Sequence, residues 1–233
     1  MQPKNNIKMA NKNKTEEQFA QVEEALSKTE QYIFDNQKSL LTILVAIVGL
    51  IAMFSVYQNF YIAPLEKEAQ TEMYLAELAF QKDSFELALN GADLQFSGFV
   101  DLSSDYSATK AGMLANYYAG LCYLNLADYN NAIDYFDSFT SDDIILSSLA
   151  NGCTGDAYLE LGDTDNALKS YRDATSSNNS FTSPKYLMKM AMVHEMNEDY
   201  SSSLEIYNKI KSDYKDSREA KTIEKFIARA KSR

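Results

Sequence analysis

The sequence contains no tryptophan, three prolines, eight glycines, two cysteines and one histidine among its 233 residues. Proline and glycine interrupt helices and mark turns, so their scarcity favours a mainly helical protein. The histidine and the cysteines show no spacing typical of metal ligands, and no nucleophile motif or phosphate-binding glycine loop occurs. We therefore expect no enzyme activity, no cofactor and no bound metal.

Cysteine is too scarce for a disulfide framework. Cys122 and Cys153 allow at most one disulfide, which would fit a domain that faces an oxidising periplasm. The alternative is that both are small, buried apolar side chains with free thiols.

Basic residues are fewer than acidic ones, 22 against 33, and the formal net charge is −11. Residues 1–38 hold as many lysines as acids, so the whole excess of negative charge lies further along the chain. An acidic domain is poorly suited to nucleic acid or to anionic lipid headgroups. We exclude both as partners of this domain.

One long apolar run is present. Residues 40–57 carry no charge and would form about 27 Å of helix, close to the thickness of a bilayer core. A span in lipid must be helical because its backbone amides need partners within the segment. We predict a transmembrane anchor over residues 39–60, against the alternative of a buried core helix. Representative anchor residues are Leu40, Leu44, Ile47, Leu50, Phe54 and Tyr57.

The apolar run differs from a cleavable signal peptide because 39 residues precede it and bulky residues follow it. Lys28 and Lys38 lie within 20 residues before the run, and Lys67 lies as near behind it. This bias predicts a cytoplasmic N-terminus and a periplasmic C-terminal domain, in a single-pass protein of the bacterial inner membrane.

The segment before the anchor, residues 1–38, is predicted to be a cytoplasmic tail and an amphipathic helix. Residues 1–14 are polar and lack an apolar period, so we expect disorder there. Thr15 and Gln18 have the form of a capping box, and apolar residues at helical spacing follow to about Ser39. That helix has two interpretations, an interfacial or partner-binding helix and a solvated one. Behind the anchor, Pro64 is expected to break the helix, and the domain covers residues 65–233.

The domain contains internal repeats. Residues 115–139 and 150–174 align without a gap at a spacing of 35, residues 185–210 follow with one inserted residue, and residues 76–89 form a weaker first copy. The equivalent pairs are Gly120 and Gly155, Tyr123 and Tyr158, Asp128 and Asp163, Ala132 and Ala167, and Phe136 and Tyr171.

The residue types at these positions have a physical reading. Glycine and alanine suit close crossings of two antiparallel helices, and the large aromatics would fill the space between one helix pair and the next. Asp128 and Asp163, in the turns of the two strong copies, are placed to cap the second helix of each pair. His194 stands at an aromatic position of the third copy, so we expect it to pack within the fold.

This pattern resembles the tetratricopeptide repeat family. The resemblance implies an all-α fold: after a single N-terminal transmembrane helix, an α-solenoid of about four helix pairs plus a C-terminal capping helix. We expect residues 214–232 to form that last helix, and we expect loops at residues 97–109 and 175–183.

In this family the first helix of each pair lines a groove that binds polypeptide, and the resemblance implies a groove on the equivalent residues here. Their apolar and methionine side chains suit adaptable polypeptide binding, although packing inside the solenoid is an alternative. Family members that grip a C-terminal carboxylate carry basic residues and asparagine on this groove. Tyr117, Asp156 and Glu160 stand there instead, so that clamp is absent. The candidate groove residues are Tyr117, Leu121, Asn125, Asp156, Glu160, Met188, Met192 and Met196; Leu124, Gly152, Leu159 and Glu195 hold further groove positions.

The layout of cytoplasmic start, single anchor and acidic repeat domain also resembles YfgM-like ancillary subunits of the bacterial Sec translocon, and phrases within the repeats resemble anchored repeat proteins of Bacteroidota. The resemblance implies SecYEG and a PpiD-like periplasmic chaperone as partners, with newly translocated polypeptides as ligands. The alternative is an adaptor for cell-wall or outer-membrane assembly. Regulation of a cytoplasmic enzyme would require the opposite topology.

Overall fold

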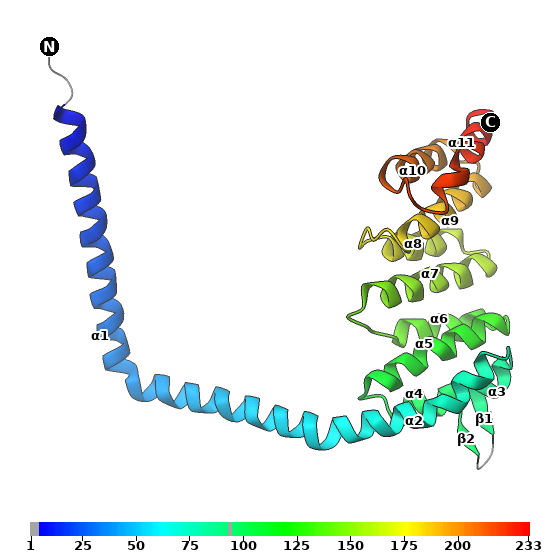
Figure 1. The fold of residues 1–233 in the computed structure, drawn as a ribbon, viewed down its shortest axis with the longest axis horizontal. Helices are drawn as coiled ribbons and strands as arrows, with labels where there is room; N and C mark the ends of the chain where they lie inside the picture. The colour runs from blue at the N-terminus through cyan, green and yellow to red at the C-terminus, as the bar shows by residue number, and fades with distance from the viewer. Residues whose placement is uncertain (1–4, 93–94) are drawn as a thin grey trace. The chain divides into compact units, whose positions relative to one another are not determined.

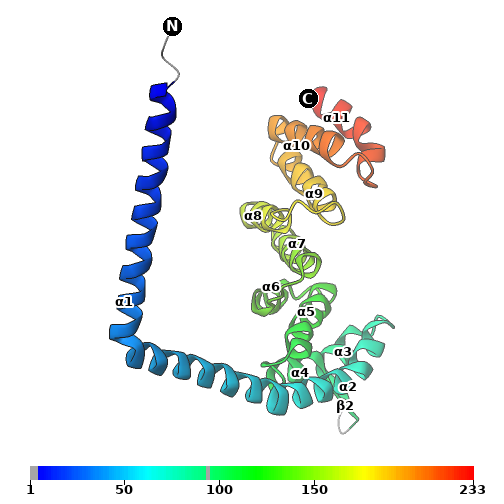
Figure 2. The same ribbon diagram turned by 60° about the vertical axis from the view of Figure 1, so that its left-hand side comes forward.

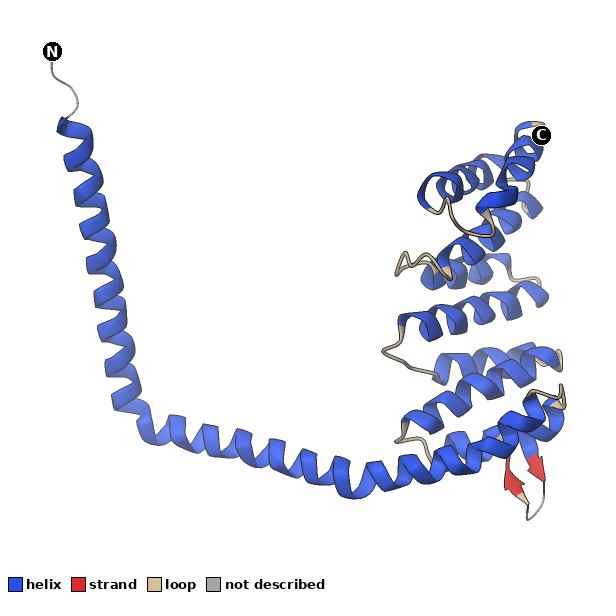
Figure 3. Ribbon diagram, viewed as in Figure 1, coloured by secondary structure: helices blue, strands red, loops and turns tan. Residues whose placement is uncertain are grey.

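The computed structural model describes residues 5–92 and 95–233, with side chains from residue 30 onward. The chain forms two compact units, Met1–Tyr61 and Ile62–Arg233. Helices dominate both units, and the strands are confined to one short hairpin (Figure 3). The predicted all-α fold, a long apolar helix followed by a repeat solenoid, is confirmed.

The first unit is built on helix α1, Asn5–Tyr57. The large apolar side chains between Leu40 and Tyr57 are 36% to 64% exposed, so neighbouring protein covers none of them. In the part of the chain that the structure describes, this is the one helix long and apolar enough to cross a bilayer. These exposed side chains include all six predicted anchor residues.

The prediction for the start of the chain is wrong in two respects. Residues 1–4 lie outside the described part, but residues 5–14 are helical rather than disordered. Thr15 lies inside α1, so no helix begins at the proposed capping box. No proline and no glycine stand between Asn5 and Gly49, so no strong helix breaker interrupts this part of α1.

The predicted break at Pro64 is also wrong. A five-residue π-helix, η1 (Gln58–Ile62), leads into α2 (Ala63–Phe80), and Ile62 keeps helical dihedrals (φ −71°, ψ −43°). Pro64 stands in the first turn of α2, where a missing backbone donor costs least. The wider π turn accommodates the residue that cannot complete the regular hydrogen-bond ladder.

The second unit is a stack of helix pairs, which Figures 1 and 2 show from two sides. Each pair packs on the next, and four clusters of buried side chains follow one another along the stack. Burial depends on stacking, as expected of repeats. The pairs are α2 with α3 (Phe85–Asn90), α5 (Lys110–Asn125) with α6 (Tyr129–Ser138), α7 (Ile144–Glu160) with α8 (Thr164–Ala174), and α9 (Ser183–Met196) with α10 (Tyr200–Asp213).

The close helix crossings predicted at the small residues are confirmed. A Cβ atom on Gly120 would lie 2.7 Å from the ring of Phe136, and one on Gly155 would lie 2.6 Å from the ring of Tyr171. Tyr171 also stacks on Tyr186 of the next pair, with ring centroids 6.1 Å apart. Tyr123 differs from expectation, because it stacks on Tyr135 of its own pair at 5.2 Å.

The turns inside the pairs share one geometry. Ala127, Gly162 and Glu198 each have positive φ, between 60° and 78°, and each stands directly before an aspartate. The aspartate side chain then accepts a backbone hydrogen bond from the third residue beyond it. The two predicted caps are confirmed, because Asp128 caps α6 and Asp163 caps α8; Asp199 caps α10 in the same way.

The predicted loop at residues 97–109 is wrong. Strand β1 (Gly91–Ala92) pairs antiparallel with β2 (Phe96–Ser97), and helix α4 (Phe99–Asp105) follows. Phe99 and Leu102 are fully buried, and Phe99 stacks on Tyr118 with ring centroids 4.9 Å apart. Burial of these two side chains favours a helix despite the serine-rich sequence around them.

The C-terminal helix is shorter than predicted. A turn at residues 215–219 and the 3₁₀-helix η2 (Ala220–Thr222) precede α11 (Ile223–Lys231). Ile223 and Ile227 are buried and Phe226 is partly buried against α10, as predicted. The loop expected at residues 175–183 is found, ending where α9 begins at Ser183.

Candidate functional site

The first helices of three successive pairs share a groove. A pocket of about 390 Å³ crosses the C-terminal halves of α5, α7 and α9 and is closed at the back by α6 and α8. The repeat places equivalent positions of successive first helices side by side. These positions therefore supply most of the residues that line the pocket. The lining residues are Leu124, Tyr129, Asp156, Leu159, Glu160, Tyr171, Lys189, Met192, Val193 and Met196.

A second pocket, of about 370 Å³, continues the groove toward α11. It shares Met192 and Met196 with the first pocket and adds Glu195, Tyr200, Arg229 and Arg233. Arg229 forms an ion pair with Glu195, which ties α11 to α9. The two pockets thus meet at the exposed methionines of α9.

The structure brings together four of the eight candidate groove residues, Asp156, Glu160, Met192 and Met196. The side chains of Tyr117 and Met188 are buried in the core clusters. The remaining two also lie outside the pocket: Leu121 packs against a core cluster, and the Asn125 side chain donates to the Leu121 carbonyl at 2.7 Å.

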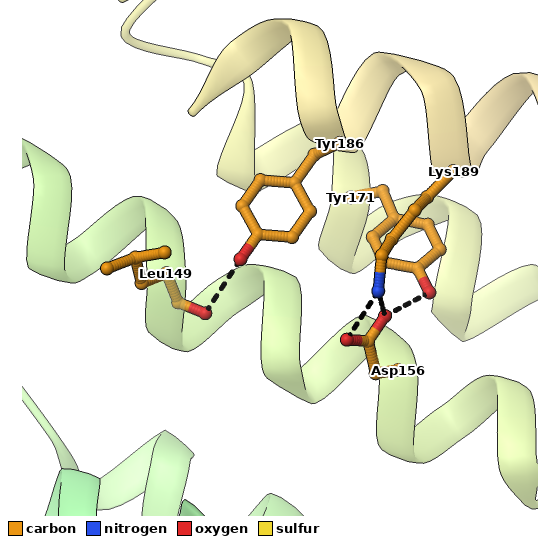
Figure 4. A network of polar contacts seen from close by, with 5 residues as sticks. All are labelled: Leu149, Asp156, Tyr171, Tyr186 and Lys189. Atoms are coloured by element: carbon orange, nitrogen blue, oxygen red, sulfur yellow. Dashed lines mark hydrogen bonds and ion pairs between the residues drawn. The ribbon is translucent and has the colours of Figure 1, made fainter. Parts of the chain in front are cut away.

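A charged network forms part of the wall of the first pocket (Figure 4). Lys189 Nζ contacts the two carboxylate oxygens of Asp156 at 2.5 and 2.7 Å, and the Tyr171 hydroxyl donates to Asp156 Oδ1 at 2.6 Å. The three residues come from α9, α7 and α8, so the network joins two helix pairs. Asp156 and Lys189 neutralise each other and leave no net charge at this point.

Comparison with known families agrees with this geometry. Two family models, both described as "Tetratricopeptide repeat", match residues 114–143 and 155–181. These two segments are similar to tetratricopeptide repeats. No curated protein matches it. A solved structure titled "Crystal structure of MamA protein" has 16% sequence identity and a TM-score of 0.48, and the match covers 70% of this chain and 90% of that one.

One tetratricopeptide match covers most of α5 and all of α6, and the other covers the end of α7, all of α8 and the loop that follows. Such repeats are protein–protein interaction modules, and the groove lies on their first helices. Sequence reasoning missed Tyr129, Tyr171, Lys189 and Val193 among the residues that line the first pocket. The sequence did mark Lys189 as unusual, because it is the one charged residue in the otherwise apolar stretch 186–193. It did not mark Tyr129, because groove residues were expected on the first helix of each pair and Tyr129 belongs to a second helix.

Neither cysteine is bridged. Burial raises the pKa of Cys122 to about 12, and burial together with the nearby Asp156 carboxylate raises that of Cys153 to about 11. The thiolate is the nucleophilic form, so both thiols are unreactive at neutral pH. Both side chains contribute to packing.

His194 has a polar role beside its packing one. Its side chain is 19% exposed, and Nδ1 lies 3.0 Å from Asp199 Oδ2. Asp199 caps α10, so the histidine helps to hold the turn between α9 and α10. Among the residues that the structure describes, no group of three or more His, Cys, Asp or Glu side chains could hold a metal ion.

Proposed function

We propose that the protein is a membrane-anchored, non-enzymatic scaffold whose tetratricopeptide groove binds polypeptides. The observation that carries the proposal is the exposure of Met192 and Met196, which are 38% and 65% exposed where the two pockets meet. Methionine is flexible and polarisable, so such a surface adapts to many apolar side chains. The unburied apolar side chains of α1 support the anchor.

We further propose that the protein lies in the bacterial inner membrane, with residues 39–60 spanning it and the repeat domain in the periplasm. There it would act as an ancillary subunit of the Sec translocon SecYEG, with a PpiD-type chaperone, on newly translocated chains. This part rests on the layout of a short charged start, one apolar helix and an acidic repeat domain. A reporter fused at Arg233 tests the topology.

The partner test is a pull-down in mild detergent, read by mass spectrometry, of the full-length protein and of a fragment starting at Leu65. We expect SecY and a PpiD-like chaperone with the full-length protein, and their loss from the fragment. Recovery of cell-envelope assembly proteins with both forms, without SecY, would instead support an assembly adaptor.

A groove variant tests whether captured polypeptides use the proposed surface. Met196→Glu places a charge where the two pockets meet and should reduce the capture of client chains several-fold. Ile144→Glu is the matched control, because Ile144 is 59% exposed but lines neither pocket of the groove. Equal losses in the two variants would show that capture depends on general surface apolarity and would contradict the groove assignment.

A further inference from the structure

The turns inside the helix pairs form one edge of the groove. Tyr129 and Tyr200, which begin α6 and α10, line the two pockets, and Glu160 and Met196, which end α7 and α9, line the first. The three turns that join these helices therefore border the groove on the same side. Glu160, at the start of the middle turn, lines the first pocket itself.

These turns carry acids and no base. Residues 125–131, 160–166 and 196–202 contain six carboxylates and neither lysine nor arginine. None of the six forms an ion pair with lysine or arginine among the described residues. The acids are Asp128, Glu160, Asp163, Asp165, Glu198 and Asp199.

Three of these acids, Asp128, Asp163 and Asp199, are held in place because they cap helices. Hydrogen bonds from Asn166 lower the pKa of Asp163, and hydrogen bonds from Ser202 lower that of Asp199. Two basic residues of the groove already form ion pairs within the protein: Lys189 pairs with Asp156, and Arg229 pairs with Glu195. Arg233, at the far end of the second pocket, is the exception.

The pocket between these charges has an apolar part. Leu124, Leu159, Met192 and Met196 line a space of about 390 Å³ together with the paired Asp156 and Lys189, and this space admits a branched aliphatic or aromatic side chain. A partner that fits both features has an apolar anchor with positive charges beside it, because complementary charge steers association and fixes register.

We infer that the groove takes a basic, apolar polypeptide segment, with an apolar side chain in the pocket and lysine or arginine against the acidic turns. This inference rests on the proposed function and names the partner class for the same groove. Acidic segments are excluded by repulsion from the turn carboxylates. The expected chemistry is a short run of aliphatic residues flanked by bases.

The test uses the full chain in a nanodisc of zwitterionic lipid and fluorescent seven-residue peptides, with an empty nanodisc as blank. The basic peptide has a central Leu-Val-Leu and two lysines on each side; a second peptide replaces the lysines with glutamates, and a third replaces the central triplet with serines. Fluorescence anisotropy at low and at physiological salt should show binding of the first peptide alone, weakened by salt.

The charge variant combines Glu160→Gln, Asp163→Asn and Asp165→Asn. Asparagine caps helices as well as aspartate does, so the fold is kept. We expect the affinity for the basic peptide to fall about five- to tenfold at low salt and the salt dependence to weaken. The control, Asp173→Asn with Glu205→Gln and Asp216→Asn, removes three exposed acids that line neither groove pocket and should change affinity less than twofold.

Three results overturn the inference: equal binding of the basic and acidic peptides, equal loss in the charge and control variants, or no binding of any peptide. Equal binding that is nevertheless lost in Met196→Glu would leave the groove as a polypeptide site without charge selection. In that case the inference fails while the proposed function stands.

Discussion

Glycine and tyrosine occupy complementary volumes in the solenoid, and Gly152 is the tightest case. A Cβ atom there would lie 1.9 Å from the Tyr186 ring, closer than any real contact. Tyr186 is fully buried, and its hydroxyl donates to the Leu149 carbonyl at 3.4 Å. The ring therefore fills the space that the absent side chain leaves, and it cannot move without opening the contact between α7 and α9.

Gly152→Ala should for this reason destabilise the second unit of the chain, Ile62–Arg233. We expect a loss of about 1–3 kcal/mol of unfolding free energy, the usual cost of overpacking a core, even though alanine favours helix more than glycine does. Urea unfolding followed by circular dichroism measures it. Asn151→Ala, at the exposed neighbouring position, is the control and should change stability by about 0.5 kcal/mol or less. Wild-type stability of Gly152→Ala would contradict the packing described here.

At the scale of single elements, helix starts are set by side-chain caps. Asp143 begins α7: its Oδ1 accepts hydrogen bonds from the backbone of Ile145 at 2.7 Å and of Leu146 at 3.0 Å. These donors would otherwise lack partners within the helix. α7 supplies part of the groove, so its start matters for the site as well as for the fold.

Asp143→Ala should cost about 1 kcal/mol of unfolding free energy, within the usual range of about 0.5–2 kcal/mol for a lost N-cap. Asp142→Ala removes the same charge one residue earlier, where the exposed side chain caps no helix, and should be close to neutral. The two midpoints in a urea titration give the comparison. Equal midpoints would show that charge near the helix start, rather than the cap itself, stabilises α7.

The elements also differ in how far the sequence predicts them. The repeats were predictable because a close crossing restricts the residue type at a fixed spacing, as at Gly120 and Gly155. Helix α4 was not, because its formation depends on burying Phe99 and Leu102 against distant parts of the chain. The π-helix η1 was missed because a proline signals a break and says nothing of a wider turn before it.

The same limit applies to the candidate site. Asp156 and Glu160 were predicted from the repeat register. The partner of Asp156, Lys189, lies 33 residues away, and only the stacking of one pair on the next brings them together. Tyr117 and Met188 hold groove positions in the register but are buried, since the depth of a side chain depends on its neighbours.

For the whole molecule, buried tyrosines are distributed along the stack. Burial is the largest cause that raises the pKa values of Tyr117, Tyr171 and Tyr186, and it raises that of Tyr207 to about 12. Above pH 10 an unfolded tyrosine loses its proton while these keep theirs, so the folded state binds more protons than the unfolded one. Stability must then fall as pH rises.

The second unit of the chain should therefore be stable up to about pH 10 and unfold progressively above it. Circular dichroism and tyrosine absorbance at alkaline pH measure the transition. Tyr207→Phe should move its midpoint to higher pH at little cost in neutral solution, because the buried hydroxyl has no hydrogen-bond partner among the described residues. An unchanged midpoint would show that Tyr207 ionises without unfolding the chain.

The positive φ angles in the turns strain the backbone at some residues and not at others. A residue with a side chain costs about 1–2 kcal/mol in the left-handed region, and glycine adopts it freely. The middle turn has Gly162 at this position, whereas the turns on either side have Ala127 and Glu198. The outer turns thus hold strain that a single codon change could relieve. Ala127→Gly or Glu198→Gly would release that strain and leave the turn geometry unchanged.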